Sequence, residues 1–274
     1  MSRAKELFDA GRLDEAVEEL LREVKANPND VERRTFLFEL SCFSGDLDRA
    51  ERQLDVIGHQ SVQAEAGVTV YRNLIRAERD RRRLLPDGLQ PHFLSEPPAY
   101  VDMHLDAVNR LREGNAEQAR RALDIAEEER PAFKGTVNGE AFEDFRDYDD
   151  LLGPVVELFV QDKYTWLPFE QIVSMQIEEP KQLRDLLWIG AAIQTTDKAL
   201  KAYLPVLYPG THEHADGLVR LGRMTDWREL GPELYLGAGL HLFAVNGDER
   251  PLLEVRAVEF DHGGGEGAQQ TEAS

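Results

Sequence analysis

Two histidines and two carboxylates within residues 210–216 are the first group in this sequence that could carry metal chemistry. His212 and His214 lie two positions apart, so their side chains point the same way if the segment is extended, and Glu213 or Asp216 could add a third ligand. No third histidine lies nearby, and the segment has the character of a loop between strands. We therefore interpret it as a solvated loop and predict no metal site.

A second group consists of six carboxylates, which could act in hydrolysis or bind a divalent cation. They are Glu140, Glu143, Asp144, Asp147, Asp149 and Asp150. They lack the Asp-x-Asp-x-Asp-Gly order of a calcium loop, which favours a charged cap or an acidic surface that faces a partner. Five arginines between residues 76 and 83 could bind an anion, but Glu78 and Asp80 beside them favour a solvated helix end.

The sequence contains none of the common enzyme motifs. There is no P-loop, Gly-x-Ser-x-Gly elbow, dinucleotide fingerprint or His-Glu-x-x-His. The single cysteine, Cys42, lies in the apolar stretch 36–43, where a buried thiol is favoured over a reactive one. We therefore predict no catalytic residue and no cofactor, and keep a metal-dependent hydrolase built on the carboxylates, His212 and His214 as the alternative.

Aromatic side chains are the better candidates for function, because exposed aromatic clusters often dominate the affinity of protein interfaces. Tyr164, Trp166 and Pro168 alternate along one expected strand. The residues that we predict to contact a partner are Phe8, Phe36, Phe43, Trp166 and Trp227. Burial in the core is the competing explanation for each of them.

A repeat in the first half predicts the elements that carry the phenylalanines. Gly11, Leu13, Ala16 and Leu20 recur at Gly45, Leu47, Ala50 and Leu54, each 34 positions later, which is the tetratricopeptide period. A third copy keeps the spacing at Gly114, Ala119 and Leu123. In such a hairpin the glycine ends the first helix in a tight turn and the alanine lets the second helix approach the first closely.

The helical half is therefore predicted to span residues 1–131 as tetratricopeptide-like hairpins. Pro28 and Pro131, each 17 residues after a repeat glycine, end the second helix of their hairpins. Residues 62–83 also read as helix, so we expect three stacked hairpins, one irregular, with an irregular connector over 84–98.

The second half, residues 132–261, is predicted to be a mixed and mostly antiparallel β domain, so that the whole chain is of the α+β class. Short apolar and aromatic runs of strand type occur at 155–160, 164–167, 171–177, 188–194, 240–245 and 252–260. One helix is expected around 181–187, and Asn246-Gly247 predicts a hairpin turn. Residues 262–274 are glycine-rich and polar, which predicts a disordered tail.

Composition excludes several classes of partner. The chain has 32 basic and 52 acidic residues, and its net charge of -20 repels nucleic-acid phosphates and anionic membranes. No apolar run is long enough for a membrane span, and the N-terminus lacks the features of a secretory signal. We expect a cytoplasmic protein that binds neither nucleic acid nor membrane.

Five blocks follow the repeat in this order: Phe142-x-x-Phe145-x-Asp147-x-Asp149-Asp150, Tyr164-x-Trp166-x-Pro168, Arg184-Asp185-Leu186-Leu187-Trp188, Leu204-Pro205-x-Leu207-Tyr208-Pro209 and Leu221-Gly222-Arg223-x-Thr225-Asp226-Trp227. With these blocks the sequence resembles, over nearly the whole chain, the type VI secretion accessory family called TagJ or ImpE. In these blocks, Asp185, Arg223 and Asp226 are expected to form partly buried ion pairs.

The resemblance implies a non-catalytic adaptor in the cytoplasm. Such a protein would grip a helix of the small subunit of the contractile sheath and act, indirectly, on sheath recycling by an AAA+ ATPase. We expect a groove on the helical half, or between the two halves, to accept an amphipathic helix. A tetratricopeptide chaperone or regulator unrelated to secretion is the remaining alternative.

Overall fold

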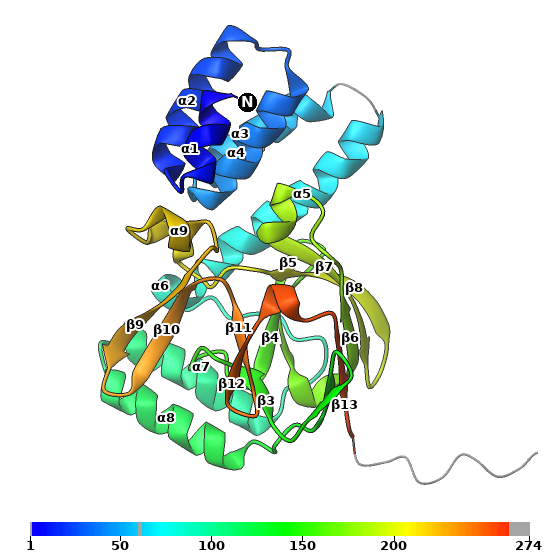
Figure 1. The fold of residues 1–274 in the computed structure, drawn as a ribbon. Coiled ribbons are helices and arrows are strands. Elements are labelled where there is room, and N and C mark those ends of the chain that lie inside the picture. The colour runs from blue at the N-terminus through cyan, green and yellow to red at the C-terminus, as the bar shows by residue number, and fades with distance from the viewer. Residues whose placement is uncertain (1, 60–61, 263–274) are drawn as a thin grey trace, which may run out of the picture.

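The computed structural model describes residues 2–59 and 62–262 and confirms the α+β class (Figure 1). The predicted disordered tail, apart from His262, lies outside the described residues. Helices occupy the first half of the chain up to Glu129, and strands begin at Gly135. The division into two domains at residue 131 stays a prediction.

Two helical hairpins open the chain. They consist of α1 (Arg3–Asp9), α2 (Leu13–Ala26), α3 (Val31–Phe43) and α4 (Leu47–Gly58). Gly11 and Gly45 end the first helix of each hairpin with φ of +76° and +83°, a backbone conformation that glycine adopts without the strain that other residues incur. Ala16 and Ala50 are fully buried between the paired helices, as the repeat predicts.

The long helix α5 (Val62–Arg81), predicted as residues 62–83, leaves this pair of hairpins and runs to the β region (Figure 1). A short helix, α6 (Leu84–Asp87), follows and leads to the third hairpin, α7 (Ala99–Arg112) and α8 (Ala116–Glu129). The expected stack of three hairpins is wrong, because α7 and α8 lie across the β region from α1–α4 and α8 packs on β9 (Thr225–Gly231). The proline-rich connector explains this, since His92 within it pairs with Thr165 of a strand and carries the chain past the sheet.

An eight-stranded sheet forms the centre of the second half. Its order is β2-β1-β13-β6-β7-β8-β4-β5, and every strand pairing in it is antiparallel. The strands are β1 (Gly135–Val137), β2 (Glu140–Phe142), β4 (Val155–Val160), β5 (Lys163–Pro168), β6 (Ile172–Ile177), β7 (Trp188–Thr195), β8 (Ala199–Pro205) and β13 (Ala257–Phe260). The predicted strands at 155–160, 164–167, 171–177 and 188–194 all lie in this sheet.

Two smaller sheets pack beside it. The first has the order β12 (Asp248–Pro251), β11 (Leu242–Val245) and β3 (Phe145–Asp147), and the second pairs β9 with β10 (Leu234–Gly239). A cluster of phenylalanines joins the three-stranded sheet to the large one, with the rings of Phe145 and Phe169 5.0 Å apart and those of Phe145 and Phe260 5.5 Å apart.

Two predictions for the second half need correction. The turn at Asn246-Gly247 is confirmed, but it joins β11 to β12, while residues 252–260 split into a 3-10 helix (Leu252–Glu254) and β13. The helix expected around 181–187 is a 3-10 turn, Leu183–Leu186, which Asp185 caps by accepting the backbone N–H of Gln182 at 2.9 Å. No helix among the described residues is both long and apolar enough to cross a membrane.

The turns of the first two hairpins dock on residues 210–223. A Cβ atom added at Gly11 would lie 2.6 Å from Leu218, and one added at Gly45 would overlap the ring of His212. Both repeat glycines therefore serve a close approach of two segments as well as a turn.

Polar contacts accompany this docking. Arg220 pairs with Asp14 at 2.9 Å, and Arg223 donates to the carbonyl of Asp9 at 2.8 Å while it covers the ring of Phe8 at 4.9 Å. The hairpins and the β region consequently form one connected body with the candidate site at its junction.

Candidate functional site

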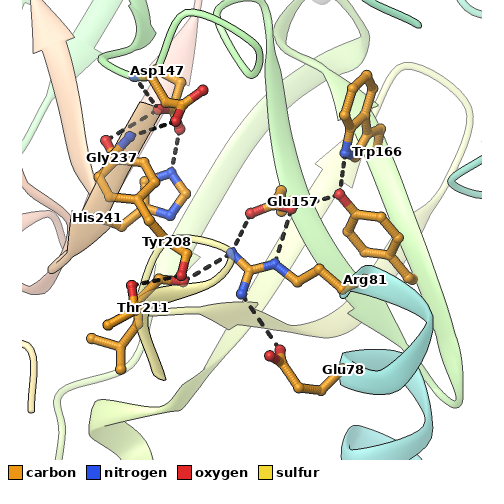
Figure 2. Close-up of polar contacts among 12 residues, drawn as sticks. Glu78, Arg81, Asp147, Glu157, Trp166, Tyr208, Thr211, Gly237 and His241 are labelled. Atoms are coloured by element: carbon orange, nitrogen blue, oxygen red, sulfur yellow. Dashed lines mark hydrogen bonds and ion pairs between the residues drawn. The ribbon is translucent and has the colours of Figure 1, made fainter. Parts of the chain in front are cut away.

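The buried arginine at the end of α5 fastens the helical half to the sheet (Figure 2). Arg81 is 3% exposed, and its Nε donates to Glu157 Oε1 on β4 at 3.0 Å, while its Nη2 donates to Glu157 Oε2 and, at 2.8 Å, to the carbonyl of Leu207. Burial alone would lower the pKa of Arg81, but the adjacent Glu157 carboxylate raises it above the usual value. The guanidinium therefore stays charged, with Glu157 as its counterion.

The same carboxylate ties two strands together. Glu157 accepts the hydroxyl of Tyr164 on β5 at 2.6 Å, and Trp166 donates its indole N–H to that hydroxyl (Figure 2). Trp166 is fully buried, so this predicted contact residue lies in the core and cannot touch a partner in this conformation.

A second buried network surrounds Asp147 on β3 (Figure 2). Asp147 contacts His241 Nε2, accepts the backbone N–H of Asp149 at 2.8 Å and lies 3.3 Å from the hydroxyl of Tyr208. Tyr208 stacks on His241 with 4.2 Å between ring centroids. These contacts hold the segment that follows β8 against the three-stranded sheet.

Asp149, two residues after Asp147, belongs to the same network and has a raised pKa. Its two oxygens accept the backbone N–H groups of Leu151 and Gly237, each at 2.8 Å. Burial raises the pKa of Asp149 to about 7, and the charge of Asp147 adds to the increase. Asp149 thus links the loop after β3 to β10 and changes its charge near neutral pH.

Asp147, His241 and Cys42 are residue types that often act in catalysis, but all three are buried. Asp147 with His241 is a carboxylate-imidazole pair, but the two residues are 0% and 2% exposed, so a substrate cannot reach them. Burial raises the pKa of the Cys42 thiol well above its usual value, which disfavours a reactive thiolate. The arrangement is that of a structural support.

The structure disperses the residues of the alternative metal site. Residues 211–213 form a 3-10 helix instead of an extended segment, so His212 packs on Gly45 while His214 Nε2 lies 3.1 Å from Asp226. Within the described residues, no group of three or more His, Cys, Asp and Glu side chains is placed to hold a metal ion.

The predicted acidic surface and basic helix end are each correct only in part. Asp144 pairs with Arg130 at 2.8 Å near the surface, but Asp147 and Asp149 are buried. Arg83 is exposed and contacts Asp87 at 2.8 Å, whereas Arg81 is the buried arginine described above.

Partly buried ion pairs were expected at Asp185, Arg223 and Asp226. The prediction is wrong for Asp185 and Arg223, and Asp226 forms an ion pair that is not buried. Asp185 caps backbone N–H groups, and Arg223 contacts a carbonyl and an aromatic ring. Asp226 does pair with His214, but its side chain is exposed.

The remaining aromatic candidates differ in exposure. Phe43 and Phe8 are buried at 1% and 7%, while Phe36 and Trp227 are half-buried. The ring of Trp227 lies 5.7 Å from that of Tyr208, so this tryptophan flanks the second network. Contact of Phe36 and Trp227 with a partner stays a prediction.

An open cavity of about 370 Å³ lies directly beside the two networks and completes the candidate site. We call it the junction pocket, because α5, α6, the loop after β3, the segment after β8 and β9–β10 all contribute to it. It is lined mostly by apolar side chains, among them Leu84, Leu85, Pro86, Leu151, Leu152 and Leu236. Its polar lining comprises Arg81, Arg82, Asp149, His212, Glu213 and Arg228.

Sequence reasoning missed this site, although one signal for it was present. Glu157 stands in the middle of the apolar run Val-Val-Glu-Leu-Phe-Val, and a charge in a buried strand requires a buried partner. Its partner Arg81 lies 76 residues away in the sequence, a separation that no local pattern connects.

His104 on α7 supplies a testable pH dependence beside the pocket. Its Nδ1 lies 2.8 Å from the carbonyl of Leu151, and burial lowers the pKa of His104 from 6.5 to about 4. The native state therefore binds fewer protons than the unfolded state between these values, so this contribution to stability is complete above pH 6.5 and is lost as the pH falls to about 4.

We expect the free energy of unfolding of the wild type minus that of His104→Gln to fall by about 3 kcal/mol between pH 7 and pH 4. Urea titrations of both proteins at four pH values measure it. Titrating groups that both proteins share, such as Asp149, cancel in the difference. A difference that is constant across this range would contradict the expectation.

Comparisons with known proteins agree on a family. Residues 139–259 match the ImpE protein family. A Pseudomonas aeruginosa protein named type VI secretion system accessory component TagJ is 35% identical over 259 residues, which cover 94% of this chain and 91% of that protein. A crystal structure of a Vibrio parahaemolyticus protein superposes with a TM-score of 0.87 at 25% identity, covering 95% of this chain and 98% of the other.

Proposed function

This chain belongs to the type VI secretion accessory family called TagJ or ImpE, and on that premise we propose that it is a non-catalytic adaptor that binds a helix of the small sheath subunit. The adaptor works in the cytoplasm. By holding the subunit it influences sheath assembly and, indirectly, recycling by an AAA+ ATPase.

The observation that carries this proposal is the pairing of an open and largely apolar pocket with polar networks whose Asp147, His241 and Glu157 are buried away from solvent. Asp147, His241 and Glu157 are each at most 2% exposed, so they support the fold and leave no accessible acid-base pair in the networks. The junction pocket, in contrast, offers apolar surface to a partner. The net charge of -20 disfavours nucleic acid as that partner.

Titration calorimetry with the two purified sheath subunits tests the proposal. We expect saturable binding of the small subunit, and of a synthetic peptide that carries its helix, with no binding of the large subunit alone. A peptide of the same composition with a central proline is the matched control, because proline disrupts the helix that must be recognised. Absence of binding to the small subunit and to all its helical peptides would refute the adaptor function.

A further inference from the structure

The volume and the lining of the junction pocket suit the binding of an apolar side chain. Its volume of about 370 Å³ falls within the roughly 300–1,000 Å³ of pockets that bind small ligands. Leu84, Leu151 and Leu152 are buried beneath its surface, and Leu85 and Leu236 complete the apolar wall.

The walls are held in place before anything binds. The carboxylate of Asp149 joins the N–H of Leu151 to that of Gly237, at 2.8 Å each, and so fixes the loop after β3 to β10. Arg82 is fixed in the same way, since it donates to Glu78 at 3.0 Å and to the carbonyl of Gly45 at 2.9 Å. A preformed pocket of this kind binds without a large cost of ordering.

Three of the polar residues that line the pocket are not available to pair with a charged partner. Arg81 and Arg82 are already satisfied by Glu157 and Glu78. Burial lowers the pKa of His212, which leaves that imidazole neutral at neutral pH.

Two charged residues at the pocket remain available to a partner. Arg228 on β9 is exposed and has no ion pair with any described residue. Glu213, whose side chain is 73% exposed, lies on a different element, the 3-10 helix after β8. Arg228 is therefore the cation to which a carboxylate of the partner can bind without displacing another group.

We propose that the junction pocket receives a leucine-sized or phenylalanine-sized side chain of the bound helix, and that an acidic residue about one turn from this anchor pairs with Arg228. This inference rests on the proposed function and identifies the surface that performs it. The helix presents both groups to the pocket because residues three or four positions apart share one face.

Two variants test the pocket, each with a matched control. Leu85→Trp fills it from α6, where Leu85 is only half-buried, and Val173→Trp places the same side chain at an exposed position of β6 that does not line the pocket. Arg228→Glu reverses the charge at the pocket, and Arg121→Glu reverses an exposed arginine on α8. Calorimetry with the small sheath subunit gives the affinity of each variant.

Leu85→Trp and Arg228→Glu are expected to weaken binding by at least about tenfold, whereas both controls stay within roughly twofold of the wild type. The loss of affinity in Arg228→Glu should become smaller as the salt concentration is raised. Replacing the acidic residue of the bound helix by lysine should restore the affinity of that helix for Arg228→Glu. If circular dichroism shows that Leu85→Trp is not folded, the test rests on Arg228→Glu and on its binding to the helix that carries the lysine.

Three outcomes would overturn the proposal. Wild-type affinity in both pocket variants would show that the helix binds elsewhere, while the adaptor function itself would stand. A small apolar molecule that co-purifies with the wild type and is lost from Leu85→Trp, without a change in sheath affinity, would make the pocket a small-ligand site. Failure of the wild type to bind the sheath subunit would remove the proposed function and this inference together.

Discussion

Replacing Glu157 by alanine is expected to lower the free energy of unfolding by about 3–5 kcal/mol. The variant would remove the carboxylate that binds two nitrogens of Arg81, and the guanidinium, at 3% exposure, would keep only its contact with Glu78 at 3.4 Å. It would also remove the acceptor of Tyr164. Because the free energy of unfolding of native proteins is only about 5–15 kcal/mol, this substitution would remove a large fraction of it. Urea unfolding followed by circular dichroism measures the change.

Two further variants show whether burial is the cause of this loss. Glu6→Ala breaks the exposed pair of Arg3 and Glu6, whose side chains are 61% and 51% exposed, and should cost at most about 1 kcal/mol. Replacing Arg81 and Glu157 together by Met and Leu should recover much of the loss, because no buried charge is then left without a partner. A Glu157→Ala variant no less stable than Glu6→Ala would contradict the interpretation.

Gly45→Ala is the second substitution for which a large effect is expected, about 2–5 kcal/mol. Two costs add. The residue must keep a φ of +83°, which strains any residue with a Cβ, and the new methyl group overlaps the ring of His212. Chemical denaturation gives the free energy, and limited proteolysis between the hairpins and the β region reports whether their docking loosens.

Gly114→Ala separates these two costs, because Gly114 occupies the same repeat position with a φ of +77° but has no described neighbour within 4 Å of the added Cβ. It should cost only the backbone strain, about 1–2 kcal/mol. Measured in a His212→Ala background, the cost of Gly45→Ala should approach that of Gly114→Ala. Equal losses in the two single glycine variants would mean that the contact with His212 contributes nothing.

Patterns that depend on neighbouring residues predicted the fold well. The repeat glycines predicted the hairpin turns, and the apolar run at 155–160 coincides with β4. Strand β8, in contrast, was missed, because Ala-Leu-Lys-Ala-Tyr-Leu-Pro is rich in helix-forming residues. Its strand conformation comes from pairing with β7 over seven residues, a tertiary effect that overrides local propensity.

The candidate site was harder to predict, because its residues meet from distant parts of the chain. Trp166 and Phe43 look like binding anchors by residue type, yet both are packed in the core. Composition cannot distinguish a buried aromatic side chain from an exposed one. The sequence does not distinguish Arg228 from other arginines. Its role depends on its position at the pocket and on the lack of an ion pair with any described residue, and both are properties of the folded chain.

The close fit of Gly11 and Gly45 against residues 210–223 also bears on how this architecture can evolve. Solenoid proteins lengthen readily, because each repeat contacts only its neighbours and a new unit can be inserted anywhere. Here an additional hairpin between α4 and α5 would carry Gly45 away from His212 while Arg81 stayed locked to Glu157. The number of hairpins before α5 is therefore set by the C-terminal half, and a relative with a longer array would need a rebuilt 210–223 segment.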